Sequence, residues 1–264
     1  MVKQQRQAKN LSTRPEYESL AARSLAEYRF PCSIEPVSLV PASTETKLVD
    51  DMGSIEGLQG TVGPGYVISG ALKYSRESYW PEPPHVAFAN LLADKPEAVE
   101  AFTKRYGVLS RDYIDRNDPD GQNFAIDSIT FLFKWDTFRN AWMAECATNE
   151  EEYPKNGLGV ISIVEIESYV EQSFETDVRV SEGLVHLWPR DTWSSICFLF
   201  LWDARAGKLG FCGNPGCPAP YFRKKRKTQK YCEQGPCVQH AQRQYSLDWW
   251  NRVGKKRREK RVKT

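Results

Sequence analysis

Apolar residues recur at helical spacing along much of this chain. Because side chains three and four positions apart share one helical face, the pattern predicts five helices before the cysteine-rich end. The expected ranges are residues 15–30, 94–107, 123–146, 160–173 and 189–207. Asp94 is expected to cap the second helix and Asp191 to begin the fifth, while Gly107 and Gly207 should end them. The third range is aromatic on nearly every side, so we expect it to be the most buried helix.

Strands are predicted where short apolar runs stand between chain breakers. Residues 31–82 are rich in Pro and Gly, and the runs Tyr66–Ile68 and Leu72–Tyr74 lie among them. A small hairpin is expected from Val178–Val180 and Leu184–Leu187, with a Glu-Gly turn between them. The expected fold class is therefore α+β, with a mainly helical N-terminal domain that also contains short strands.

Four of the seven cysteines fall within 26 residues, as two matched pairs. Each pair encloses four residues, and both loops, Asn214–Gly216 and Gln234–Pro236, contain residues that favour turns. Structural zinc takes four soft ligands at tetrahedral corners, which two such pairs supply. We therefore expect one structural Zn²⁺ ion, with the ligands Cys212, Cys217, Cys232 and Cys237.

Two alternatives to this zinc site stay open. An iron–sulfur cluster can also take four cysteines, and His240 could replace one thiolate as a zinc ligand. The remaining cysteines stand in apolar or isolated contexts and are expected in the core. These are Cys32, Cys146 and Cys197.

The residues between and after the cysteine pairs predict a treble-clef-like module with a basic C-terminal helix. Tyr221–Arg223 and Gln229–Tyr231 are expected to pair as strands across the turn Lys224–Lys227, and a helix is expected after Cys237. Because so small a segment has little core, zinc would supply its folding free energy, on the order of 10 kcal/mol. The aromatic residues expected to pack around the metal are Tyr221, Phe222 and Tyr231. Those expected on the apolar face of the helix are Tyr245, Trp249 and Trp250.

Charge divides the chain at the same place. Residues 207–264 hold 16 Lys or Arg against 3 Asp or Glu, a net charge of +13, whereas residues 1–206 hold 20 against 31, a net charge of −11. We expect an acidic body over 1–206 and a basic zinc finger and tail over 207–264. Such asymmetry favours nucleic acid as the partner of the basic part. The expected contacts are Arg223, Lys224, Lys225, Arg226, Lys227, Lys230, Arg243, Arg252, Lys255, Lys256, Arg257 and Arg258.

Several other classes of protein are disfavoured. No run of about 18 apolar residues occurs, and the first twenty residues do not have the pattern of a signal peptide, so we expect a cytoplasmic protein without a membrane partner. No catalytic constellation is recognisable, and four thiolates leave zinc no open position, so we do not expect an enzyme. DNA is favoured over RNA. The alternative is a zinc-stabilised protein- or RNA-interaction module on a ligand-sensing body, and a homodimer and a small-molecule effector stay open.

The run CGNPGCPAPYFRKKRKTQKYCEQGPC, followed by a basic helix, resembles the CGNR zinc finger family. The preceding body resembles that family's usual partner, the stress-induced transcription regulator (ABATE) domain, through Arg105–Leu109, the hairpin and the helix Asp191–Ala206. The resemblance is closest over 190–250, loose over 90–190 and absent over the first 80 residues. It implies a bacterial DNA-binding transcription regulator that binds zinc through the same four cysteines. The family has Cys-Gly-Asn-Arg at the last cysteine, where this chain has Cys237–His240, so one basic contact of the family is missing here.

Overall fold

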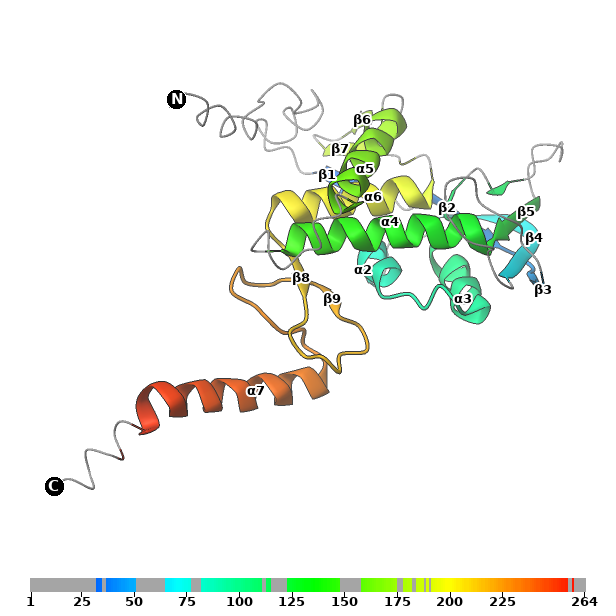
Figure 1. Cartoon of the computed structure of the whole chain (residues 1–264). Helices are drawn as coiled ribbons and strands as arrows, with labels where there is room; N and C mark the ends of the chain where they lie inside the picture. Colours follow the sequence, from blue (N-terminus) through cyan, green and yellow to red (C-terminus); the bar gives the residue numbers. More distant parts are fainter. Residues whose placement is uncertain are drawn as a thin grey trace, which may run out of the picture.

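The computed structural model describes most of the chain as one set of helices and small sheets (Figure 1). The described residues are 32–34, 37–50, 65–76, 82–110, 113–114, 123–147, 158–174, 178–181, 184–187, 189, 191–255 and 258. The predicted helix over 15–30 lies outside them. Among the described residues, none of the helices combines the length and the apolar character needed to cross a membrane.

Strand β4 (Gly65–Arg76) organises the larger sheet. Its second half pairs antiparallel with β2 (Val37–Pro41), and its first half pairs antiparallel with both β3 (Glu45–Val49) and β5 (Asn123–Asp127). At the junction of β2 and β3 the backbone comes very close to Gly70, where an added Cβ would lie 1.9 Å from the carbonyl oxygen of Ser43. Glycine is therefore required at this point of close approach.

The second sheet contains the predicted hairpin. Strands β6 (Val178–Ser181) and β7 (Leu184–Leu187) pair antiparallel, as expected from the sequence. Strand β1 (Cys32–Ile34) adds to β7 in parallel, a pairing between segments about 150 residues apart that no local pattern indicates.

Among the described residues of the body, five helices accompany these sheets. Their bounds are α2 (Pro84–Ala89), α3 (Pro96–Tyr106), α4 (Ser128–Cys146), α5 (Leu158–Phe174) and α6 (Thr192–Arg205). Aromatic rings join three of them in one core, because Phe88 of α2 lies 5.4 Å from Phe138 of α4, and Phe138 lies 5.1 Å from Phe200 of α6. Edge-to-face pairs at such distances add to the free energy gained from burial.

Three of the helix predictions need correction. The residues 123–127 form β5 because they pair with β4, so the helix begins only at Ser128, capped by the Asp127 side chain. Helix α3 begins at Pro96 after Lys95 and has no side-chain cap, so the predicted Asp94 cap is wrong. Helix α4 is not the most buried helix, because five of its 19 residues are buried, against eight of 14 in α6.

The C-terminal part leaves the body after α6. Strands β8 (Leu209–Phe211) and β9 (Tyr221–Arg223) form a two-stranded antiparallel ladder, followed by α7 (Gly235–Trp249) and the π-helical turn η3 (Trp250–Gly254). The predicted pairing of Tyr221–Arg223 with Gln229–Tyr231 is wrong, because β9 pairs with β8. In Figure 1, α7 projects away from the helices of the body.

Candidate metal centre and basic surface

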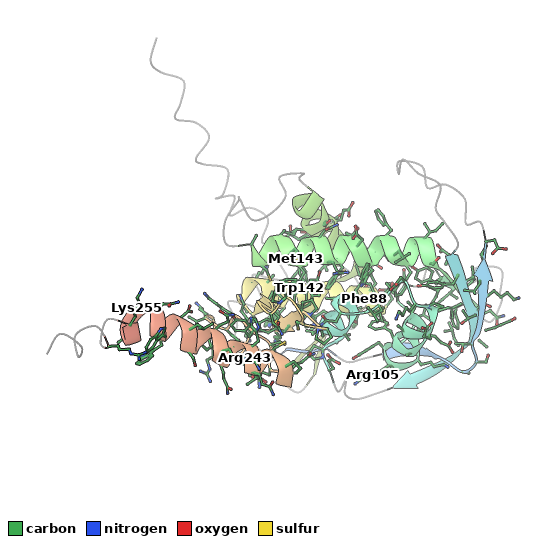
Figure 2. All side chains as sticks on the ribbon, turned by 60° about the horizontal axis from the view of Figure 1, so that its bottom comes forward. Phe88, Arg105, Trp142, Met143, Arg243 and Lys255 are labelled. Atoms are coloured by element: carbon green, nitrogen blue, oxygen red, sulfur yellow. The ribbon has the colours of Figure 1, made fainter. Side chains whose placement is uncertain are left out.

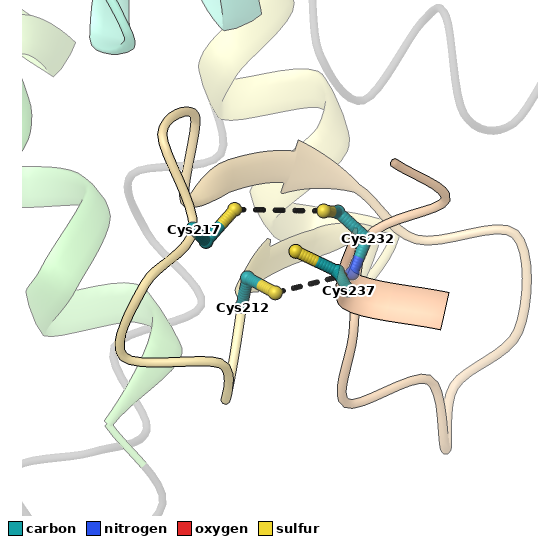
Figure 3. A group of neighbouring side chains, drawn as sticks. All are labelled: Cys212, Cys217, Cys232 and Cys237. Carbon is teal, nitrogen blue, oxygen red and sulfur yellow. Dashed lines mark hydrogen bonds between the residues drawn. The ribbon is translucent and has the colours of Figure 1, made fainter. Parts of the chain in front are cut away.

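The two cysteine pairs converge on one point (Figure 3). Cys212 directly follows β8, Cys217 ends the first loop, Cys232 precedes α7, and Cys237 lies in the first turn of that helix. Their four sulfur atoms all lie within 4.8 Å of one another. The four cysteines therefore converge, as the sequence predicted, with one pair in the loop that follows β8 and the other pair around the start of α7.

Local hydrogen bonds hold both turns. The amide of Cys217 donates to the carbonyl of Asn214 at 3.0 Å, and the amide of Cys237 donates to the carbonyl of Gln234 at 2.9 Å. The Asn214 side chain links the two loops, since its Nδ2 donates to the Sγ of Cys237 at 3.2 Å. The amide of Cys232 donates to the Sγ of Cys212 at 3.4 Å. Amide–sulfur bonds of this kind orient thiolate ligands.

The distance between two of the sulfurs is close to that expected around a tetrahedral ion. Tetrahedral sulfurs with metal–sulfur bonds of about 2.3 Å would stand about 3.8 Å apart, and the Sγ atoms of Cys217 and Cys232 are 3.6 Å apart. The group can therefore hold a metal ion. His240 does not belong to the converging group and instead contacts the ring of Tyr231, at 5.6 Å between centroids.

Proton affinities differ within the group. Burial raises the pKa of Cys217 to about 11, and burial likewise raises the pKa of Cys232. Burial also acts to raise the pKa of Cys237, but hydrogen bonds from Asn214 and the neighbouring thiols outweigh it and lower the pKa. Metal binding requires thiolates, so it must release protons from the first two cysteines.

Two of the three predicted aromatic residues pack around the cysteines. Phe222 and Tyr231 form a small apolar cluster with the four sulfur-bearing residues. Phe222 lies across Gly210, where an added Cβ would come within 2.7 Å of its ring. The prediction for Tyr221 is wrong, because its side chain belongs to the core of the body.

The cysteine module is fixed to the body by specific contacts. The side chain of Asn90 makes two hydrogen bonds with the backbone of Tyr221, at 2.7 and 3.1 Å. The Tyr221 hydroxyl accepts a hydrogen bond from Nε of Arg139 at 2.7 Å, and the indole N–H of Trp142 donates to the carbonyl of Gly210 at 3.1 Å. The module is therefore docked on α2 and α4 through β8 and β9.

A buried charged cluster, which sequence reasoning missed, lies at this junction. Oδ2 of Asp203 on α6 accepts from Nε2 of His85 on α2 at 3.1 Å and from Nε of Arg223 on β9 at 2.6 Å. Burial lowers the pKa of His85, so its imidazole is neutral and donates. Burial acts to raise the pKa of Asp203, but the hydrogen bonds from His85 and Arg223 outweigh it and lower the pKa. The carboxylate thus stays charged between its two partners.

The predicted basic contacts fall into different groups. Arg223 is bound to Asp203, and the Nζ of Lys225 pairs with Glu233 at 2.6 Å. Lys224 is half-buried and its backbone amide donates to the carbonyl of Lys208. The side chains of Arg223 and Lys225 are therefore paired with acidic residues of the chain, whereas the contact of Lys224 involves only its backbone.

The other predicted cations that the structure describes are exposed to solvent. On the loop that follows β9, Arg226, Lys227 and Lys230 are exposed and have no acidic partner among the described residues; we call these three the loop cations. We call α7, η3 and the described residues that follow them the C-terminal arm. Its exposed cations are Arg243, Arg252, Lys255 and Arg258. Figure 2 shows Arg243 and Lys255 along this arm. The predicted contacts Lys256 and Arg257 lie outside the described residues.

Comparisons of this chain with protein-family models, with curated proteins and with solved structures find no match. What the site does is therefore argued from its own residues.

Proposed function

We propose that this chain binds nucleic acid, DNA in preference to RNA, through a treble-clef-like module built on one structural Zn²⁺ ion, and that it acts as a transcription regulator. The proposal rests on the loop cations, which have no acidic partner among the described residues and lie in the module that contains the four converging cysteines. The loop cations stand directly between the second and third cysteines in the sequence, so metal binding would fix their positions.

Zinc is the metal we assign because four thiolates in tetrahedral reach are its usual structural ligands. With all four positions taken by sulfur, no site is left for water or substrate, so the ion would act only in folding. The cluster of four cysteines with Phe222 and Tyr231 is too small to hold the module alone. Zinc would supply the missing free energy of folding.

Charge explains the preference for a polyanion. Lys and Arg side chains neutralise phosphates and release condensed counterions, which gives affinity without base recognition. A docked module presents these charges in a fixed arrangement. A solubilising tail would require neither a metal site nor the hydrogen bonds that Asn90 and Arg139 of the body make with Tyr221. The resemblance of the cysteine run to a family of DNA-binding regulators supports the same proposal.

The test is a titration of the zinc-loaded chain against labelled random duplex DNA at low and at high salt. We expect log K to fall linearly with log salt, with a slope of about −0.9 for each phosphate contact. Reversal of the three loop cations, Arg226→Glu with Lys227→Glu and Lys230→Glu, should weaken binding and make the slope shallower by about 3.

The matched control reverses three exposed cations of the body, Lys47, Lys95 and Arg105, which changes the net charge by the same amount. If both triple variants bind equally well, the loop is not the contact. If the zinc-loaded wild type binds no duplex at low salt, duplex DNA is excluded and the alternative, an RNA- or protein-interaction module, is the one to pursue.

A further inference from the structure

The C-terminal end of α7 holds two indole rings against a glycine. Trp249 ends the α-helix and Trp250 opens the π-helical turn, in which the amide of Lys255 donates to the carbonyl of Trp250. Both rings pack on Gly254, because an added Cβ there would lie 2.5 Å from Cε3 of Trp250 and 3.0 Å from Cζ3 of Trp249. We call Trp249, Trp250 and Gly254 the indole platform. The π-helical geometry matters here because such turns are rare and are frequent at functional sites.

The outer faces of this platform remain in water. Trp249 is 51% exposed and Trp250 is 41% exposed, although Gly254 beneath them is buried. A single exposed apolar residue needs no explanation. Two adjacent indoles that pack on a glycine are different. The contact with the glycine fixes the two rings in place, so a partner can bind their flat, polarisable faces with less loss of side-chain entropy.

Positive charge surrounds the platform. Arg252 and Lys255 belong to the same turn or follow it directly, and Asp248 is the only acidic residue between Gly235 and Lys255. A shallow hollow on the surface of α7 is lined by Gln239, Gln242, Arg243, Ser246 and Leu247. Trp250 follows this row of residues at helical spacing, so it lies on the same side of the helix.

We propose that the indole platform stacks the unpaired bases of a single-stranded nucleic acid while the adjoining cations neutralise its backbone, an inference that rests on the proposed function. Stacking on aromatic side chains inside a basic groove is how proteins hold single strands without strong sequence preference. In a duplex the base faces are covered by neighbouring pairs, so the rings would find no partner there. A second copy of the chain fits less well, because two arms of like charge would repel one another.

The experiment measures the affinity of the zinc-loaded full chain for three labelled probes at one salt concentration. The probes are an oligothymidylate, an abasic strand of the same length, and a duplex of that length. The oligothymidylate and the abasic strand carry the same phosphates, so their difference reports contacts to bases. We expect the oligothymidylate to bind more tightly by roughly 5- to 150-fold for one stacked base.

Variants assign that difference to the two rings. The double variant Trp249→Leu with Trp250→Leu keeps an apolar surface and should reduce oligothymidylate affinity to that of the abasic strand. The double variant with Tyr at both positions should retain most of the difference because it keeps aromatic faces. Trp202→Leu on α6 is the matched control, since Trp202 is 45% exposed but lies on the body, and it should change nothing.

Each contrary result has a distinct meaning. Equal affinity of the wild type for oligothymidylate and the abasic strand overturns the platform proposal, and the proposed function survives if binding to the duplex is salt-dependent. Absence of binding to all three probes, with zinc present, refutes the proposed function itself. A dimer that dissociates in the double Leu variant, with base discrimination unchanged, would assign the rings to a contact between copies and overturn the proposal.

Discussion

The carboxylate of Asp203 joins three elements, since it lies on α6 and accepts hydrogen bonds from His85 on α2 and Arg223 on β9. The substitution Asp203→Ala removes both interactions at once. The imidazole N–H of His85 would be left buried without its acceptor, at a cost of about 1–3 kcal/mol. Removing one member of a buried ion pair costs about 3–5 kcal/mol, but Arg223 is 45% exposed and can regain contact with water. We therefore expect a loss of about 3 kcal/mol, at the low end of that range.

Urea unfolding of the zinc-loaded chain measures this cost. For an unchanged slope, a loss of about 3 kcal/mol lowers the midpoint by about 1 M urea or more. Asp203→Asn should cost less, because the amide oxygen can still accept one hydrogen bond. Asp136→Ala on α4 is the control, since Asp136 is exposed and, among the described residues, its side chain accepts a hydrogen bond from Asn140 at 3.1 Å; this substitution should cost under about 0.5 kcal/mol. An Asp203→Ala midpoint equal to that of the control would refute the reasoning.

Three further predictions concern other sites. Burial lowers the pKa of His85 below the ordinary 6.5, so the unfolded state binds more protons, and stability should fall as the pH drops below about 6.5. Thermal unfolding measured across this pH range should show a smaller fall for His85→Gln than for the wild type. Cys237→Ser should abolish stoichiometric metal binding, as measured by metal analysis of the purified chain, whereas Cys146→Ser, outside the cluster, should leave it intact. Gly70→Ala would place its Cβ against the carbonyl of Ser43 and should lower stability by about 1–3 kcal/mol in urea unfolding. An unchanged stability would mean that β2 and β3 shift freely to make room for the added methyl group.

Features encoded by neighbouring residues could be predicted from the sequence. Helix α6 is one, because its cap and its end are local: Asp191 accepts a hydrogen bond from the amide of Ser194, and Gly207 adopts a positive φ of 63° just past the helix. The four-cysteine group is another, because each pair needs only a short turn to bring its thiols together. Local rules are sufficient where the partners are a few residues apart.

Features that depend on distant partners could not be predicted in this way. Residues 123–127 alternate between exposed and buried positions, but Ile126 also stands at helical spacing from Ile129, so the predicted helix extends over them. They form a strand because β4 offers an edge more than fifty residues away. Strand β9 was assigned the wrong partner for another reason, because both Gln229–Tyr231 and β8 lie close to it in the sequence and local pattern does not choose between them; in the structure β9 pairs with β8, and Phe222 lies across Gly210. The cluster of His85 and Asp203 spans 118 residues of sequence and has no local signature.

Strand β9 explains how the cysteine module and the body hold each other. Successive side chains of a strand point to opposite faces, and the three residues of β9 follow that rule. Tyr221 packs in the core of the body and Arg223 binds Asp203, whereas Phe222, between them, packs against the cysteines. The alternation directs Arg223, which remains 45% exposed, towards Asp203, although Arg223 begins a run of five basic residues. The positive charge without an acidic partner therefore lies further along the loop, at the loop cations. For this reason the charge-reversal variant changes the loop cations and leaves Arg223 in place.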